Sequence, residues 1–568
     1  MVQKGESFEG QEKFDVCIVG GGISGLYCAM KLMSDPRTPE RGIKNIALLE
    51  GSDRLGGRFE ADGNGVSGTF RFAFKDPDSG ATSAMPLISQ LVKDLGMQDD
   101  VGSNGINAAC KFMGDTVSFF GGHRITSLDV KLNPAIWKEL FQLKDDEVIR
   151  SVLEADMLVY KKVLKHNQEK LEEKYPDRAA AILAQQDPTL LQQYQDPEFW
   201  SFFRNEFSWT VGSQEVPLRD LSMSTLVPLM DFSPGFCNLA GFCCLAGFDS
   251  SAGSYLQSQT IMKMIVTDSH HLSHGWPSLI NKLEKQLLDL DGSNGIKIKL
   301  RRNCKVSSLS FAKEETDPIF IGFEDLEDCK TVAITADQIV MATPPPAAEN
   351  IDLLFDGAKI GNPRCEAKML GGGKTSIELY FKSDWWNKEG DKKMRGASYS
   401  DLPCSVIIPF YSSCVENNCS GCDTCSDDPC PVGLTILGGR KHPQFWSSLQ
   451  RLGSPYNLCA IKNPKLTPTS EAVVEVAMEQ LKKIFRCETN PPRPAMATYK
   501  SLTKDSKYGA PTYTWSAGVN DREIECSETI QGKKVYFCHD SWSDCQNWVE
   551  GSLRSSKKVV ENMLEKIK

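Results

Sequence analysis

Closely spaced glycines near the start of the chain form a candidate anion-binding turn. The pattern GxGxxG spans residues 20–25, after an apolar strand predicted over residues 15–20 and before a helix predicted over residues 26–32. In such a turn the glycines allow a sharp bend, close approach of a pyrophosphate to the backbone, and tight packing of helix on strand. The pattern predicts a dinucleotide site, and its expected contact residues are Gly20, Gly22, Ile23, Ser24 and Gly25.

An acidic residue stands where a dinucleotide site needs one. A second apolar strand is predicted over residues 45–50, which closes a βαβ unit with a parallel pair of strands. Glu50 ends this strand, 25 residues after Gly25. We expect its carboxylate to bind ribose hydroxyls.

Two arginines and two glycines follow Glu50 in the spacing ExxxRxGGR, which places Arg54, Gly57 and Arg58 at fixed positions. Arginines beside a dinucleotide can neutralise its diphosphate and hydrogen-bond its oxygens in a fork. This segment resembles the second flavin motif of the amine oxidase superfamily, which includes monoamine oxidases, polyamine oxidases and L-amino acid oxidases. We expect the chain to bind one dinucleotide, so a second one such as NADPH is not expected.

The resemblance extends along the chain and implies a site for FAD. Residues 336–345 are similar to the strand that returns the chain from the flavin domain, and residues 536–555 are similar to the closing motif FAGE…GWxEGAxxSG. Within the closing motif, Asp540 replaces the usual glutamate that holds the ribityl chain, and His539 replaces a glycine. The further flavin contacts that the resemblance implies are Phe70, Arg71, Val306, Asp540, Trp548 and Val549. Because residues 504–515, where covalent relatives attach their flavin, contain no cysteine, noncovalent FAD is expected.

Arg71 is the residue that distinguishes the possible substrates. The stretch Gly68 to Phe72 is similar to the Gly-x-Met-Arg-hydrophobic segment of L-amino acid oxidases, whose arginine grips the substrate carboxylate. A bidentate guanidinium–carboxylate pair would favour amino acids over amines that lack the carboxylate. The alternative is an arginine bound to the flavin pyrophosphate or to surface water.

Two further residues are hypotheses for the catalytic site. Tyr411 follows a segment similar to the substrate-binding strand of animal L-amino acid oxidases, and could support the substrate carboxylate; a core or loop aromatic is the alternative. Lys374 stands two residues before the position, Ser376, where the family lysine near the flavin is expected. It could assist oxygen reduction, or it could be a solvated lysine at a strand edge.

Five cysteines, Cys414 to Cys430, follow one another closely between polar residues. The spacing suits disulfides or a metal clip in a solvated loop, and catalysis is expected to need no metal. Disulfides and the sequon at Asn418 would suit an oxidising compartment. The first 14 residues contain no apolar signal region. A secreted protein with this sequence would therefore be one whose signal peptide has been removed.

The elements around these residues predict an α/β protein, α+β overall, of several domains. Its 568 residues exceed a single small domain. A Rossmann-like FAD-binding domain is expected from residues 10–64, 275–345 and 530–568, a mixed-sheet substrate domain from 65–130 and 346–529, and a helical insertion over 131–274. The net charge of −10 and the absence of long basic or apolar tracts argue against nucleic-acid and membrane partners.

Taken together, these features predict an FAD-dependent L-amino acid oxidase. The expected partners are an L-amino acid and molecular oxygen, the products are a 2-oxo acid, ammonia and hydrogen peroxide, and the resemblance implies a homodimer. One alternative is an amine or polyamine oxidase acting on substrates without a carboxylate. Another is a flavin-bearing binding or scaffolding protein without turnover.

Overall fold

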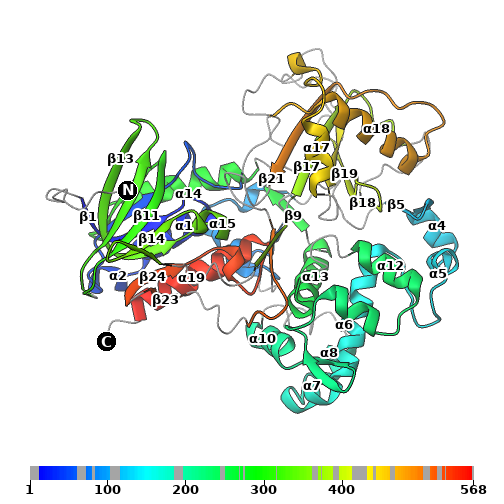
Figure 1. The fold of residues 1–568 in the computed structure, drawn as a ribbon, viewed down its shortest axis with the longest axis horizontal. Coiled ribbons are helices and arrows are strands. Elements are labelled where there is room, and N and C mark those ends of the chain that lie inside the picture. Colours follow the sequence, from blue (N-terminus) through cyan, green and yellow to red (C-terminus); the bar gives the residue numbers. More distant parts are fainter. Residues whose placement is uncertain are drawn as a thin grey trace.

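A computed structural model of the chain separates it into a large sheet with helices, a second sheet, and a group of helices (Figure 1). It describes residues 12–59, 72–79, 83–102, 116–184, 196–243, 250–267, 269–272, 275–314, 316–360, 369–372, 374–387, 396–411, 432–438, 443–460, 467–502, 512–520, 527–530 and 532–565. This arrangement confirms the mixed α/β class.

The large sheet has ten strands and is built from distant parts of the chain. β1, β2, β10 and β24 join β13 as a parallel set, in which the central strands β1 and β2 bury their apolar residues and the edge strand β10 is partly exposed. The parallel pairing of β1 with β2 confirms the predicted βαβ unit. The strands of this set are β10 (Lys297–Arg301), β2 (Asn45–Leu49), β1 (Lys13–Val19), β13 (Lys330–Met341) and β24 (Lys533–Phe537).

An antiparallel extension completes this sheet beyond β13. β11 (Cys304–Phe311) and β12 (Ile319–Asp325) pair antiparallel, and β12 pairs antiparallel with β13. β14 (Asp352–Phe355), β15 (Ala358–Ile360) and β23 (Ser527–Ile530) also belong to the sheet. The sequence analysis placed these last three strands in the segment predicted as the substrate domain, and their backbones pair within the large sheet. Hydrogen bonds between distant strands decide the assignment, and they leave little trace in local composition.

Helices cover the large sheet and its carboxyl edge. α1 (Ile23–Ser34) and α19 (Val549–Glu565) pack against each other, and the Ser556 hydroxyl donates to the Ser24 carbonyl at 2.9 Å. The remaining helices of this part are α2 (Arg37–Glu40), α14 (Trp276–Leu290), α15 (Pro345–Glu349) and the 3-10 turn η6 (Asp540–Trp542).

The second sheet has seven strands in the order β21-β17-β20-β19-β18-β5-β6. The apolar side of α18 (Glu471–Phe485) buries Val473, Leu481 and Ile484 in the core of this part, beside α17 (Pro443–Gln450). The strands are β21 (Met496–Leu502), β17 (Lys374–Phe381), β20 (Val432–Gly438), β19 (Val406–Tyr411), β18 (Ser398–Ser400), β5 (Val117–Phe120) and β6 (His123–Thr126).

The third part consists of helices between residues 127 and 267, with one hairpin of β7 (Ser208–Val211) and β8 (Gln214–Pro217). α6 begins at Val152, and ahead of it Glu147 accepts from the Ser233 N–H at 2.6 Å, just before α12. The helices are α4 (Ser127–Leu132), α5 (Ile136–Phe141), α6 (Val152–His166), α7 (Gln168–Lys174), α8 (Ala179–Ala184), α10 (Pro197–Asn205), α11 (Met223–Leu229), α12 (Pro234–Cys243) and α13 (Ala252–Thr267). Among the helices that the structure describes, none has the length and apolar character needed to cross a membrane.

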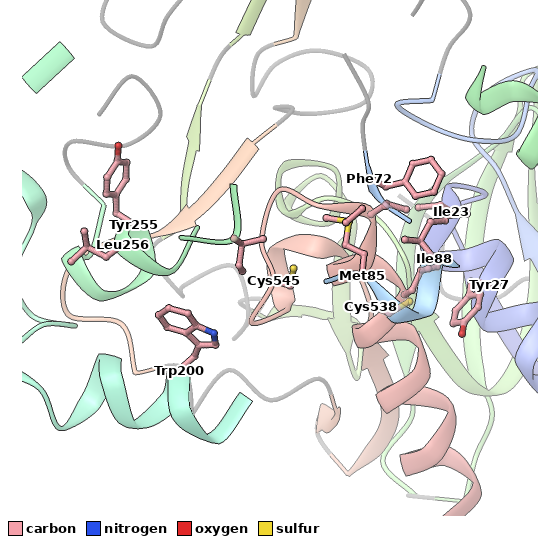
Figure 2. Close-up of a cluster of buried hydrophobic side chains, with 14 of the residues drawn as sticks. Ile23, Tyr27, Phe72, Met85, Ile88, Trp200, Tyr255, Leu256, Cys538 and Cys545 are labelled. Atoms are coloured by element: carbon pink, nitrogen blue, oxygen red, sulfur yellow. The ribbon is translucent and has the colours of Figure 1, made fainter. Parts of the chain in front are cut away.

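A buried cluster joins the large sheet to the segment that follows residue 71. Figure 2 shows Ile23 of α1, Phe72 of β3 (Phe72–Ala73) and Ile88 of α3 (Pro86–Asp94) gathered with Met85 and Cys538. β3 and β4 (Val101–Gly102) both pair with β9 (Ser269–Leu272), which leads into α14. The candidate site lies along this junction.

Candidate active site

The glycine turn has the geometry that its sequence predicts. Gly20 has φ +110° and a Cβ there would lie 2.8 Å from the Ala342 carbonyl oxygen, while a Cβ on Gly25 would lie 2.0 Å from the Gly20 carbonyl oxygen. A Cβ on Gly22 would meet nothing within 4 Å. The first and third glycines therefore permit close backbone contacts, and the second leaves open space in front of the turn.

The N-terminus of α1 faces that open space without a side-chain cap. Gly22 is the N-cap residue, and no side chain accepts a hydrogen bond from the first turn among the described contacts. Ile23 and Ser24 begin the helix and are buried. The N–H groups of a first turn and the helix dipole favour an anion. This end of α1 therefore fits a pyrophosphate.

Glu50 is buried beside the turn and holds it in place. Its Oε2 accepts from the Gly21 N–H at 2.7 Å, and its Oε1 accepts from the Ser52 N–H at 2.8 Å and hydroxyl at 2.7 Å. A carboxylate has about four acceptor sites, so capacity remains for a ribose hydroxyl. The Glu50 carbonyl accepts from the Cys304 N–H at 2.8 Å, and this bond brings Val306, at an irregularity of β11, close to the turn.

Arg54 has a different set of contacts from the diphosphate contact that the sequence predicts. Its guanidinium donates to three carbonyl oxygens of its own loop, those of Leu55 at 3.2 Å, Gly57 at 2.7 Å and Phe59 at 3.1 Å. These bonds satisfy carbonyls that a tight loop cannot pair within itself. In the structure, Arg54 shapes the loop that carries the second arginine.

Gly56 and Gly57 let that loop lie against the glycine turn. Both have positive φ, and the Gly56 N–H donates to the Gly21 carbonyl at 2.9 Å. A Cβ on Gly57 would lie 3.4 Å from the Gly22 Cα. Glycine is therefore needed at both positions because each has positive φ and the loop lies close to the turn. The two arginines on either side do not by themselves explain these glycines.

Arg58 joins this loop to the closing segment of the chain. Its Nη2 donates to Asp540 Oδ1 and contacts His539 Nε2 at 3.0 Å. Burial would raise the pKa of Asp540, but the Arg58 charge and the hydrogen bonds from Arg58 and Asn547 outweigh it, so the pKa lies below its ordinary value. Asp540 is therefore an ionised carboxylate at neutral pH, fixed at the edge of the site.

Replacing Asp540 with alanine is expected to lower the free energy of unfolding by about 3 kcal/mol, because the partly buried Arg58 guanidinium loses its carboxylate. Since the pKa of Asp540 is depressed, its stabilisation is present above pH 3.8 and is lost as the pH falls further. Urea denaturation at pH 7 and at pH 3 measures both effects. Asp337→Ala, which removes an exposed pair with Lys13, is the matched control and should change little. Equal losses in the two variants would contradict the assignment.

Asn547 and Trp548 lead into α19 beside Asp540. Asn547 adopts φ +72°, a conformation that asparagine tolerates better than most residues, and its N–H donates to Asp540 Oδ2 at 3.2 Å. The indole Nε1 of Trp548 is buried and has no hydrogen-bond partner among the described residues. Val549, buried, begins the helix. Asp540 thus contacts the residue that directly precedes Trp548 and Val549.

Glu550 is a buried carboxylate to which the sequence analysis gave no role. It accepts from the Leu87 N–H at 3.1 Å and the Ile88 N–H at 3.1 Å, and so caps α3 from the first turn of α19. Arg554, one turn later, lies 3.5 Å from its Oε1 and also pairs with Asp544. The partner of Glu550 is 463 residues away in sequence, so no local pattern could reveal it.

Glu550→Ala is expected to lower the free energy of unfolding by about 3 kcal/mol, since two N–H groups of α3 lose their acceptor and stay buried. Glu561→Ala removes an exposed pair with Lys557 on the same helix and is the control. Guanidinium denaturation of both variants checks this. A loss for Glu550→Ala no larger than for the control would rule out the capping role.

Lys374 and Tyr411 lie at opposite ends of the second sheet. Thr375, next to Lys374, pairs with Gly438, whereas Tyr411 pairs with Val432 at the other end of β20. Six residues of strand separate those ends by about 20 Å. The backbones of the two residues are therefore far apart along the strand direction.

The end that carries Lys374 is the end nearer the site. β16 (Met369–Gly372), which precedes β17, pairs with β22 (Thr512–Trp515), and the Trp515 N–H donates to Gln546 Oε1 at 3.2 Å. Gln546 is next to Asn547 and Trp548. The strand register places the backbone of Tyr411 at the other end of β20 from this edge, and its contact with the substrate carboxylate stays a prediction.

Phe70 and Arg71 lie outside the described residues, as does the whole cysteine cluster Cys414 to Cys430. The residues that flank 60–71 are described. Phe59 stacks on Trp276 with ring centroids 4.6 Å apart, and Phe72 meets the same indole edge-on at 5.5 Å. The neighbour of Arg58 and the neighbour of Arg71 thus pack on one side chain.

The described residues fit a flavin dinucleotide. The uncapped start of α1 suits the pyrophosphate, Glu50 suits a ribose, and Asp540 suits further hydroxyl groups. Beside Gly20, the buried Thr343 hydroxyl has no partner among the described residues, as expected for a group that a ligand completes.

Comparison with protein families agrees with this geometry. The model of the family described as flavin containing amine oxidoreductase matches residues 23–564, almost the whole chain. This match confirms the superfamily that the sequence motifs suggest. The comparison with curated protein sequences finds no match for this chain.

Solved structures with the same fold include two kinds of amine oxidase. Cyclohexylamine oxidase from Brevibacterium oxydans IH-35A superposes with a TM-score of 0.57 at 14% identity, covering 97% of this chain and 99% of that chain. A putrescine oxidase variant from a redesign of cofactor binding gives 0.56 at 13% identity, covering 97% of this chain and 99% of that chain. At such identities the likeness establishes the fold.

Proposed function

Because the chain belongs to the family of flavin-containing amine oxidoreductases, we propose that it binds FAD noncovalently and oxidises the α-amino group of L-amino acids. The reaction takes an amino acid, oxygen and water to a 2-oxo acid, ammonia and hydrogen peroxide. The substrate class goes beyond what family membership gives, and it rests on Arg71.

Bound FAD would supply the two-electron oxidation of the C–N bond and pass the electrons to oxygen. The chain's own residues would hold the cofactor and orient the substrate. The first turn of α1 would bind the pyrophosphate, Glu50 a ribose hydroxyl, and Asp540 a hydroxyl of the ribityl chain. Trp548 would stand beside the substrate and exclude water, and Lys374, at the near end of β17, would place a positive charge towards the reacting oxygen.

The observation that carries the substrate assignment is an arginine one residue before a fixed anchor. Phe72 is fully buried in the cluster that contains Ile23 and Trp276, so the chain directly after Arg71 is held beside the flavin part. A guanidinium in such a place can bind a carboxylate through two parallel hydrogen bonds. That interaction would fix the Cα hydrogen relative to the cofactor.

Oxidation of amines without a carboxylate is the second candidate. The structural relatives are named for cyclohexylamine and putrescine, and neither compound has a carboxylate. Under this alternative Arg71 would serve the flavin pyrophosphate, and the substrate would bind without a guanidinium–carboxylate contact.

An anaerobic panel separates the candidates. The purified holoenzyme is mixed with each of the twenty L-amino acids, with their decarboxylated amines, and with cyclohexylamine and putrescine, while the flavin absorbance near 450 nm is followed. We expect bleaching by one or more amino acids and by none of the matching amines. Bleaching by amines alone would support the second candidate, and no bleaching by any compound would indicate a flavin protein without this turnover.

A further inference from the structure

A buried imidazole lies between the two charges at the edge of the site. His539 is 5% exposed, and its ring contacts Arg58 through Nε2 at 3.0 Å and Asp540 Oδ1 through Nδ1 at 3.1 Å. Its Nδ1 is also 2.8 Å from the Ser541 hydroxyl. Arg58, His539 and Asp540 thus form one connected unit, which we call the Arg58–His539–Asp540 bridge.

The contacts assign the proton on the ring. A guanidinium can only donate, so the Arg58 contact requires Nε2 to be unprotonated, which places the proton on Nδ1. From there it can be donated to the Ser541 hydroxyl or to Asp540. The Ser541 N–H, at 3.2 Å from Nδ1, would favour the other tautomer, but the charge-assisted Arg58 bond is the shorter and stronger contact.

The bridge leaves one oxygen of Asp540 available. Oδ1 is held by Arg58 and approached by His539, whereas the described partner of Oδ2 is the Asn547 N–H at 3.2 Å. A carboxylate oxygen that accepts one bond can accept another. Oδ2 is therefore the oxygen that can meet a hydroxyl group of a ligand, and its position depends on how Oδ1 is held.

We propose that His539 is a positioning residue of the cofactor site, whose neutral imidazole locks Arg58 and Asp540 together so that Asp540 Oδ2 is fixed for a hydroxyl of the flavin. This inference rests on the proposal that the cofactor is FAD. It assigns a use to a histidine at a position where the resemblance expects glycine.

Protonation of His539 would break the bridge. The added proton would sit on Nε2 and face the Arg58 guanidinium, a repulsive contact between like charges. The charged groups that face the ring among the described residues are Arg58, from the loop after β2, and Asp540 of η6. Burial, with Asp540 opposing and Arg58 assisting, lowers the pKa of His539 to about 4. Because this pKa is depressed, the stability that the neutral ring contributes begins to fall below pH 6.5. The ring in the folded protein is protonated, and the bridge broken, only as the pH falls through about 4.

The test measures flavin retention, which requires no substrate. Holoenzymes of wild type, His539→Ala, His539→Gln and the control His166→Gln are titrated for release of fluorescent FAD at pH 7.5 and along a series down to pH 3. His166 is a half-exposed histidine beside Glu215 in the helical part. Thermal unfolding of each apoprotein is recorded alongside, to separate loss of cofactor from loss of fold.

We expect His539→Ala to raise the dissociation constant of FAD about tenfold at pH 7.5, because one hydrogen bond to a charged group is lost. His539→Gln, whose carbonyl can accept from Arg58, should retain most of the affinity but lack the release step near pH 4. Wild type and His166→Gln should both show that step.

Two results would overturn the proposal. One is wild-type affinity for FAD in His539→Ala, and the other is the same acid release step in His539→Gln as in the wild type. Neither result depends on which substrate is oxidised. Failure of the proposal for His539 would therefore leave the proposed function to be tested by the anaerobic substrate panel.

Discussion

Replacing Arg71 with alanine is expected to lower kcat/KM for L-amino acids by a factor of about 30 to about 5,000, equivalent to roughly 2–5 kcal/mol, because the substrate carboxylate loses its charged partner. The loss should appear mainly on carboxylated substrates. Oxygen consumption with the best amino acid from the panel gives the rate, and flavin absorbance shows that the cofactor is still bound.

Two comparisons make this result specific. Arg451→Ala, at an exposed arginine in the region of the second sheet, should leave kcat/KM unchanged. Residual oxidation of the decarboxylated amine should be no slower in Arg71→Ala than in the wild type. If Arg71→Ala loses its flavin, or oxidises amines and amino acids equally slowly, the result would indicate that Arg71 binds the cofactor instead.

Gly25→Ala is expected to abolish flavin binding and to lower the free energy of unfolding of the apoprotein by about 3 kcal/mol. The new methyl group would lie 2.0 Å from the Gly20 carbonyl oxygen, and both atoms belong to the turn itself. The start of α1 would have to move away from β1, which would remove the anion site and open the packing beneath it.

Gly22→Ala is the matched variant, and it should separate binding from folding. A Cβ there meets nothing within 4 Å and the φ of −70° suits alanine, so apoprotein stability should change by less than about 1 kcal/mol. The methyl group would nevertheless occupy the approach to the backbone, so we expect at least about a tenfold weaker affinity for FAD. Urea denaturation and FAD titration check the pair. Equal destabilisation by the two substitutions would contradict the roles assigned to these glycines.

The sequence alone predicted the dinucleotide turn and most of the strands around it. The close backbone contacts that require glycine at Gly20 and Gly25, and the open space at Gly22, all lie within six residues. The spacing of these glycines therefore predicts the conformation of the turn. The strand predicted over 45–50 agrees with β2 to within one residue, because a run of apolar residues indicates a buried strand.

Only the tertiary structure decided what the charged residues of the site contact. Arg58 reaches His539 across 481 positions, Glu550 reaches α3 across 463, and Arg54 turns to its own loop. The register of β20 separated Tyr411 from Lys374. A side chain's partner depends on which distant strands and helices pack side by side, and that packing is settled by the summed burial of the whole core rather than by the residues adjacent in sequence.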